Sequence, residues 1–179
     1  PACGKSEECI LGQQNLKKII TDWGKAEERS PSGSLIFGFG KYTAAFDDAE
    51  MSYWAGHASL KRKLYPEAFI AFKKASQLLA RIDRSKDSRS MRMFEGSLLG
   101  AIESAESSND QSLKLASYRL YLELNPHGNK RDEIKYQIGH IFYENEDYLQ
   151  AANLFREIAI DKLAPTSLRE KSSELCLDS

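Results

Sequence analysis

Two histidines each follow a tyrosine by four residues, a spacing that places the two rings one helical turn apart on the same face. The pairs are Tyr53 with His57 and Tyr136 with His140. Side chains of these types could bind an apolar segment or, with further ligands, hold a metal ion. No cysteine lies near either histidine in the sequence. We therefore expect no metal site and interpret both pairs as binding residues.

Other spacings that could support catalysis are incomplete. In a phosphate-binding loop, the lysine of Gly40-Lys41 would precede Ser or Thr, but Tyr42 follows it, and Leu35 stands where the leading glycine belongs. No nucleophile elbow and no paired His and Cys are present. The sequence thus predicts a protein that is not an enzyme and uses no cofactor. The acidic clusters are interpreted as solvated helix ends: Asp47-Asp48 and Glu144-Glu146-Asp147.

Composition indicates the kind of scaffold that carries these residues. The chain of 179 residues has no valine and three threonines, so residues that favour strands are few apart from isoleucine. Hydrophobic residues make up 41% of the chain, including 8 Tyr, 8 Phe and 2 Trp, which is ample material for a core. We predict an all-α protein with one continuous domain. The longest apolar stretch, 35–39, is too short to cross a bilayer.

Apolar spacing between the prolines predicts a succession of helices. Their expected ranges are 8–28, 42–64, 66–82, 91–107, 111–124, 130–145, 147–161 and 166–177. Three glycines between residues 33 and 40 predict an irregular segment at about 30–41. Short connections between helices favour consecutive antiparallel pairs.

Two stretches of the chain repeat the same spacing without gaps. The first has Gly56, Tyr65, Ala68 and Phe72; the second has Gly139, Tyr148, Ala151 and Phe155. A small residue on each helix lets two backbones approach closely, and the aromatic ring fills the space beside them. The spacing therefore predicts that each phenylalanine packs near its glycine. A weaker copy lies between them, with Ile102 at the glycine position and Tyr121 at the alanine position.

This pattern resembles the tetratricopeptide repeat (TPR), a helical hairpin of about 34 residues. The resemblance implies an α-solenoid of about three TPR-like hairpins, preceded by an N-terminal helix and followed by a capping helix. The implied boundaries are 1–41 for the N-terminal helix and Gly-rich segment, 42–164 for the repeats (42–82, 91–126 and 130–164), and 165–179 for the cap. TPR arrays bind segments of other proteins on their concave side. The resemblance therefore implies a non-enzymatic scaffold whose partner is another protein or peptide.

Carried over position by position, the resemblance implies a peptide-binding groove. Its residues are Tyr53, His57, Lys61, Leu99, Glu103, Tyr136, His140 and Tyr143. His57 and His140 stand where some relatives have an asparagine that clamps a peptide carboxylate, so an apolar or amphipathic segment is the expected ligand. The alternative is that the tyrosines only cover neighbouring helices.

The segment 30–41 allows two interpretations. It either lies across a groove, or it is a loop whose Phe37 and Phe39 plug the N-terminal end of the repeats.

The N-terminal residues bear on location. Pro1-Ala2-Cys3-Gly4 resembles the end of a bacterial lipoprotein signal, which would make Cys3 a lipidation site. Residues 121–158 resemble the TPR variety of bacterial envelope lipoproteins and periplasmic assembly factors. Together these favour a periplasmic or outer-membrane lipoprotein over a cytoplasmic protein, with membrane contact only through a lipid anchor. Cys3 and Cys9 could instead form a disulfide, and Cys176 is a third cysteine.

Charge supplies an alternative function. Residues 61–100 carry ten Lys or Arg against four Asp or Glu, within a chain of net charge −1. This basic block, mainly 61–92, could bind nucleic acid or an anionic surface. Aromatic residues do not alternate with its cations in the way that base stacking requires, so the sequence disfavours nucleic acid. The identity of the partner and the oligomeric state are not predicted.

Overall fold

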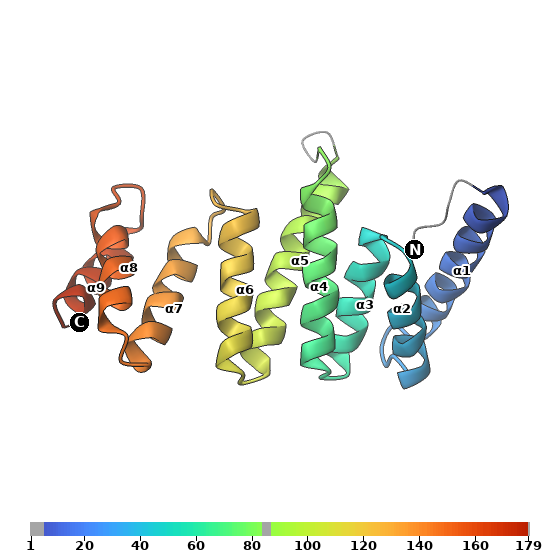
Figure 1. Cartoon of the computed structure of the whole chain (residues 1–179), viewed down its shortest axis with the longest axis horizontal. Helices are drawn as coiled ribbons and strands as arrows, with labels where there is room; N and C mark the ends of the chain where they lie inside the picture. The colour runs from blue at the N-terminus through green and yellow to red at the C-terminus, as the bar shows by residue number, and fades with distance from the viewer. Residues whose placement is uncertain (1–5, 84–86, 179) are drawn as a thin grey trace. The chain divides into compact units, whose positions relative to one another are not determined.

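The computed structural model describes residues 6–83 and 87–178 (Figure 1). These residues form nine α-helices and no β-strand, which confirms the predicted all-α class. The helices are α1 (Glu7–Ala26), α2 (Gly33–Ala45), α3 (Ala49–Lys61), α4 (Tyr65–Ala80), α5 (Ser88–Ser107), α6 (Gln111–Leu124), α7 (Arg131–Glu144), α8 (Tyr148–Ile160) and α9 (Thr166–Asp178).

The helices fall into two compact units, and the one continuous domain that the sequence predicts, with its boundaries at 41/42 and 164/165, stays a prediction. Unit 1, Pro1–Asp110, holds α1 to α5, and unit 2, Gln111–Ser179, holds α6 to α9. Within each unit, helices adjacent in sequence pack as antiparallel, hairpin-like pairs. The predicted second repeat, 91–126, begins in one unit and ends in the other, so its hairpin stays a prediction.

Three turns share a backbone conformation that supports the predicted alignment of the repeats. Lys63, Asn109 and Glu146 have φ values of 59°, 55° and 61° and follow the ends of α3, α5 and α7. Left-handed backbone just after a helix is a common way to end it. Each of the three lies seven residues after an aligned position, namely Gly56, Ile102 and Gly139. The aligned stretches therefore end their first helices in the same way.

The close contacts predicted from the repeat are present in both units. A Cβ added at Gly56 would lie 2.7 Å from the Phe72 ring, and one at Gly139 would lie 2.7 Å from the Phe155 ring. Both rings are fully buried. A third contact is not predicted by the repeat: a Cβ added at Gly100 of α5 would also lie 2.7 Å from the Phe72 ring. Phe72 thus joins α3, α4 and α5 through two glycines.

The predicted irregular segment is wrong, since most of 30–41 lies in α2. Glycine weakens a helix by roughly 0.5–1 kcal/mol per residue relative to alanine. This helix nevertheless buries Leu35, Phe39 and Tyr42 in a cluster with Ile20 and Met51. The hydroxyl of Ser32 also caps it by accepting from the Leu35 amide at 3.1 Å. Burial of one face therefore outweighs the weak helix propensity.

The same observation corrects both interpretations of the segment. A helix within the core of unit 1 is neither a strand across a groove nor a loop that plugs the repeats. Phe39 is buried, as a plug would be, but Phe37 is 65% exposed on the other side of α2. The predicted helix 42–64 is likewise divided, because α2 ends at Ala45 and Asp48 caps the start of α3.

Candidate functional site

Both tyrosine–histidine pairs form with nearly the same geometry. The ring centroids are 4.5 Å apart for Tyr53 and His57 and 4.6 Å for Tyr136 and His140, edge to face in each case. Each histidine also packs against the buried phenylalanine of the following helix, at 5.0 Å for Phe72 and 5.7 Å for Phe155. The repeat is therefore visible in side-chain contacts as well as in helix order.

Tyr53 is half-buried because it packs against a neighbouring helix. A Cβ added at Gly96 of α5 would lie 3.1 Å from the Tyr53 hydroxyl oxygen. This contact agrees with the alternative in which the tyrosines cover neighbouring helices. The next residue, Trp54, is 47% exposed, and its ring lies 5.3 Å from that of Tyr53 and 6.0 Å from that of His57. The sequence analysis missed Trp54, whose only signal was its place beside Tyr53.

The predicted residues of α5 extend this surface. Gly96, Leu99 and Glu103 follow one another at successive turns of α5, so Leu99 lies one turn beyond the contact with Tyr53. Leu99 is 40% exposed, and Glu103 is exposed. We call Trp54, His57, Tyr53 and Leu99 the α3–α5 face. It combines two exposed apolar side chains with two half-buried rings.

Lys61 makes a contact that the sequence did not predict. Its ammonium group donates to the Glu28 carbonyl oxygen at 2.5 Å, which links the end of α3 to the connection between α1 and α2. The positive charge is thus held beside the backbone that follows α1. This charge still affects the α3–α5 face, because it lowers the pKa of His57.

In unit 2, α7 carries the other predicted residues. Tyr136 and His140 pack on Phe155, and Tyr143 packs edge to face on Tyr148 at 5.4 Å. The structure thus groups five predicted groove residues in unit 1 and three in unit 2. A single groove through all eight stays a prediction.

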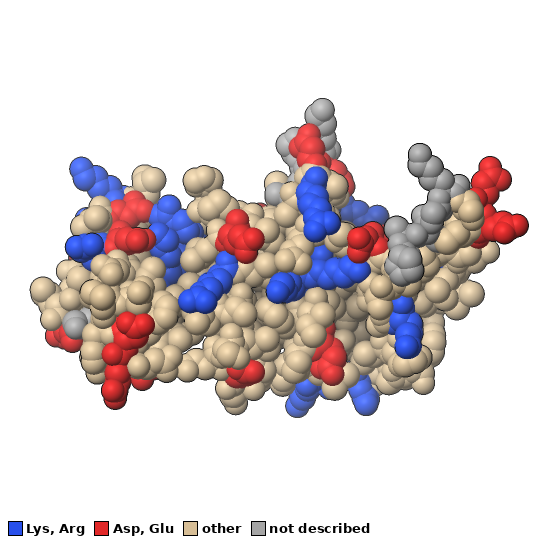
Figure 2. Space-filling view, in the orientation of Figure 1, with Lys and Arg blue, Asp and Glu red and all other residues tan. Residues whose placement is uncertain are grey.

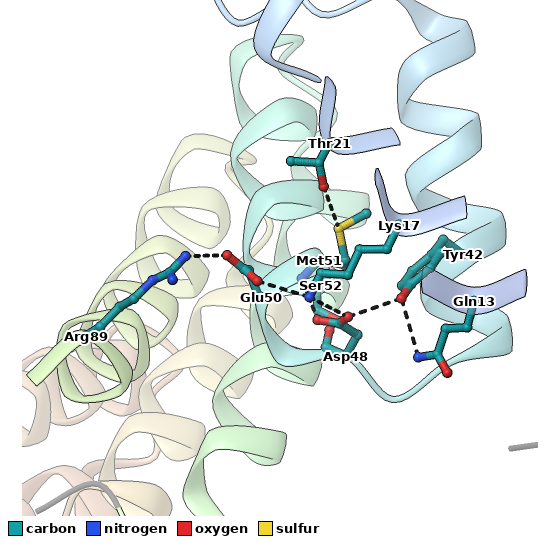
Figure 3. Close-up of polar contacts among 9 residues, drawn as sticks. All are labelled: Gln13, Lys17, Thr21, Tyr42, Asp48, Glu50, Met51, Ser52 and Arg89. Atoms are coloured by element: carbon teal, nitrogen blue, oxygen red, sulfur yellow. Dashed lines mark hydrogen bonds and ion pairs between the residues drawn. The ribbon is translucent and has the colours of Figure 1, made fainter. Parts of the chain in front are cut away.

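A polar network braces the helices around the α3–α5 face (Figure 3). The Lys17 ammonium lies 2.9 Å from Asp48 and 3.0 Å from Glu50, and Arg89 forms an ion pair with Glu50. The buried Tyr42 hydroxyl donates to Asp48 at 3.1 Å. Asp48 also accepts from the Met51 amide at 3.1 Å. The network therefore ties α1, α2 and α5 to the first turn of α3.

Burial opposes the charged form of Lys17, but the hydrogen bonds and charges of Asp48 and Glu50 outweigh it and raise its pKa. Burial also raises the pKa of Tyr42, so the phenol stays protonated and can donate. The sequence interpretation of Asp47-Asp48 as a solvated end is wrong for Asp48, whose side chain is only 12% exposed. It holds for Asp47, which is 72% exposed and pairs with Lys74.

The basic block does not gather into one patch on the face that Figure 2 shows. Lys and Arg side chains over α3 to α5 are interspersed with Asp and Glu. Several of its cations also have partners within the chain. Lys61 contacts a carbonyl oxygen, Lys74 pairs with Asp47 at 3.0 Å, and Arg89 pairs with Glu50. Arg84 and Lys86 lie outside the described residues.

The predicted lipidation site, Cys3, also lies outside the described residues. Cys9 is disulfide-bonded, whereas Cys176 is a free thiol that lies 3.6 Å from the Ala152 carbonyl oxygen. Within 6–83 and 87–178, no helix is long and apolar enough to span a membrane. No three His, Cys, Asp or Glu side chains in these ranges are grouped so that they could hold a metal ion.

No protein-family model matches the chain, and neither a curated protein nor a solved structure does. The fold and the repeated contacts define an all-helical, repeat-like protein built from hairpin-like pairs.

The position of His57 predicts a dependence of stability on pH. Burial lowers the pKa of His57, and the charge of Lys61 lowers it further. The unfolded chain therefore binds a proton first when the pH falls below about 6.5, and the folded state loses stability through that range. Above about pH 6.5, His57 does not make the stability of the folded state depend on pH. Thermal unfolding at about pH 7.5 and pH 5.5 should show a smaller loss for His57→Gln than for the wild type. Equal losses would contradict the assignment.

Proposed function

We propose that this protein is a TPR-like, non-enzymatic binding module that holds an apolar or amphipathic segment of another protein on the α3–α5 face. The observation that carries the proposal is the exposure of Trp54 and Leu99 beside rings that are fixed in place. Large aromatic side chains next to a rigid, partly buried base are typical centres of binding energy. Tyr53 and His57 supply that base here, since both pack on the buried Phe72.

The polar network shown in Figure 3 supports a role in binding. Binding is tighter when the surface does not have to be ordered first. Asp48 and Glu50 connect the start of α3 to Lys17 of α1 and Arg89 of α5. The helices that carry Trp54 and Leu99 are thereby linked independently of any partner.

A random peptide library displayed on phage and selected against the full chain tests the proposal. Peptides that are enriched are then measured by fluorescence anisotropy. We expect Trp54→Ala and Leu99→Ala each to weaken binding about tenfold or more, which corresponds to about 1.4 kcal/mol. Ile70→Ala is the control, because Ile70 is 65% exposed and belongs to α4, which contributes no residue to the α3–α5 face. Absence of enriched peptides, or equal binding by all variants, would refute the proposal.

The proposed location is the bacterial envelope. It rests on the resemblance of residues 121–158 to envelope TPR proteins and on the sequence around Cys3. Mass spectrometry of the protein purified from its own cells, with and without reduction, distinguishes a lipid on Cys3 from the alternative disulfide with Cys9, because one sulfur atom cannot carry both. A Cys3 without a lipid in that sample would contradict the lipoprotein assignment.

A further inference from the structure

Two large hydrophobic side chains project from helices on one side of unit 1. Phe37 of α2 and Ile70 of α4 are each 65% exposed. Figure 1 shows α2 and α4 on the side of unit 1 that faces the viewer. Lys74 of α4 ties these helices together, because its ammonium group donates to the carbonyl oxygens of Thr43 and Phe46 at the end of α2. Phe37 and Ile70 therefore belong to the same side of the molecule.

The exposed side of α2 has one charge and small residues around its aromatic ring. Lys41 is the only charged residue of α2, and its ammonium nitrogen lies 5.1 Å from the centroid of the Phe37 ring. Gly33 and Gly40 lie one helical turn to either side of Phe37, and a Cβ added at either would meet nothing within 4 Å. The open surface beside the ring leaves it free to enter an apolar medium while the lysine stays in water.

The same arrangement recurs on α4. Lys73 follows Ile70 by one helical turn, as Lys41 follows Phe37 on α2. Both lysines are exposed, and within the described residues neither ammonium group pairs with an acidic side chain. Glu67 is the only acidic residue in either helix. We call Phe37, Lys41, Ile70 and Lys73 the α2–α4 face, which combines exposed apolar side chains with unpaired positive charge.

The placement of the cations favours one kind of anionic partner. Figure 2 shows uncharged surface between the Lys and Arg side chains that lie over α2 and α4. Anionic lipid headgroups can move to each cation, so a membrane surface requires no fixed spacing of positive charges. The interface between headgroups and acyl chains also accepts exposed apolar side chains. An acidic protein segment has charges at fixed positions and offers Phe37 and Ile70 no apolar contact through those charges.

We propose that the α2–α4 face binds the surface of an anionic lipid membrane, with Lys41 and Lys73 at the headgroups and Phe37 and Ile70 in the adjoining apolar layer. This face differs from the basic block 61–92, because half of it comes from α2. It adds protein side chains to a membrane contact that the sequence analysis limited to a lipid anchor. Membrane binding and peptide binding use different helices, so each can be removed without the other.

Vesicle flotation of the full chain, produced without a lipid on Cys3, tests the proposal. We expect binding to phosphatidylcholine vesicles that contain about one third phosphatidylglycerol, and none to phosphatidylcholine alone. Lys41→Gln with Lys73→Gln should weaken binding about tenfold or more. Lys18→Gln with Lys25→Gln is the matched control, because it removes the same charge from exposed lysines of α1 and should weaken binding at most about twofold. No binding to the anionic vesicles, or equal losses for the two pairs, would overturn the proposal.

The apolar side chains separate a membrane from other polyanions. Phe37→Ala with Ile70→Ala should weaken vesicle binding about tenfold, whereas Trp54→Ala should leave it unchanged. Brominated lipids should quench the tryptophan emission of Phe37→Trp more strongly than that of the wild type, because the new ring enters the apolar layer. Circular dichroism confirms that each variant is folded. Binding that depends on the lysines but not on Phe37 and Ile70 would indicate a site for any polyanion, including an acidic protein, and would overturn the membrane assignment.

Discussion

Replacing Phe72 with alanine is expected to lower the free energy of unfolding of unit 1 by about 3–5 kcal/mol. The ring is fully buried and fills the space left by Gly56 and Gly100. Neither glycine has a side chain that could move into the space, so the cavity would persist. The ring also supports Tyr53 and His57, at 6.1 and 5.0 Å between centroids. Phe72→Ala should therefore weaken peptide binding by the α3–α5 face as well as lower the stability of unit 1.

Phe37→Ala is the matched control for Phe72→Ala, since the same side chain is removed from a position that is 65% exposed. Its expected cost is within about 0.5 kcal/mol. Urea unfolding followed by circular dichroism measures both variants. A loss below about 1.5 kcal/mol for Phe72→Ala, or equal losses for the two, would show that Phe72 does not connect α3, α4 and α5 as described.

Much of this core could be predicted from the sequence, because helix periodicity and the spacing of small and aromatic residues are local signals. The range 111–124 was predicted with the bounds that α6 has, and the contacts of Gly56 with Phe72 and Gly139 with Phe155 followed from the repeat. Gly100 was missed because the alignment placed Ile102 at the glycine position. The second contact of Phe72 is with α5, which lies outside the repeat 42–82 that was compared.

The remaining errors have one physical source, which is burial that local sequence does not reveal. Three glycines in the segment 30–41 predict an irregular chain, yet α2 forms because Leu35, Phe39 and Tyr42 share one buried face. In α1, Lys17 lies among inward-facing residues, beside the buried Ile20, because it pairs with two carboxylates of α3. Neither outcome can be predicted until the neighbouring helices are placed.

Asp48 is the residue whose importance sequence analysis most underestimated, and Asp48→Ala is expected to destabilise unit 1 by about 2–4 kcal/mol. About 1 kcal/mol comes from the lost cap on the Met51 amide. A further 1–3 kcal/mol, roughly, comes from Tyr42, whose buried hydroxyl loses its acceptor. The ion pair with Lys17 is also lost. Asp47→Ala is the neighbouring control, with an expected cost of at most about 0.5 kcal/mol.

A double-mutant cycle with Tyr42→Phe separates these contributions. In the wild type, Tyr42→Phe removes the hydrogen bond to Asp48 and should cost about 1 kcal/mol. In the Asp48→Ala background that bond is already absent, so the same change should cost close to nothing or stabilise the protein. The two sites should therefore couple by about 1 kcal/mol or more. Additive losses of unfolding free energy would mean that Tyr42 and Asp48 act independently. The polar network around the α3–α5 face would then be only a set of separate contacts.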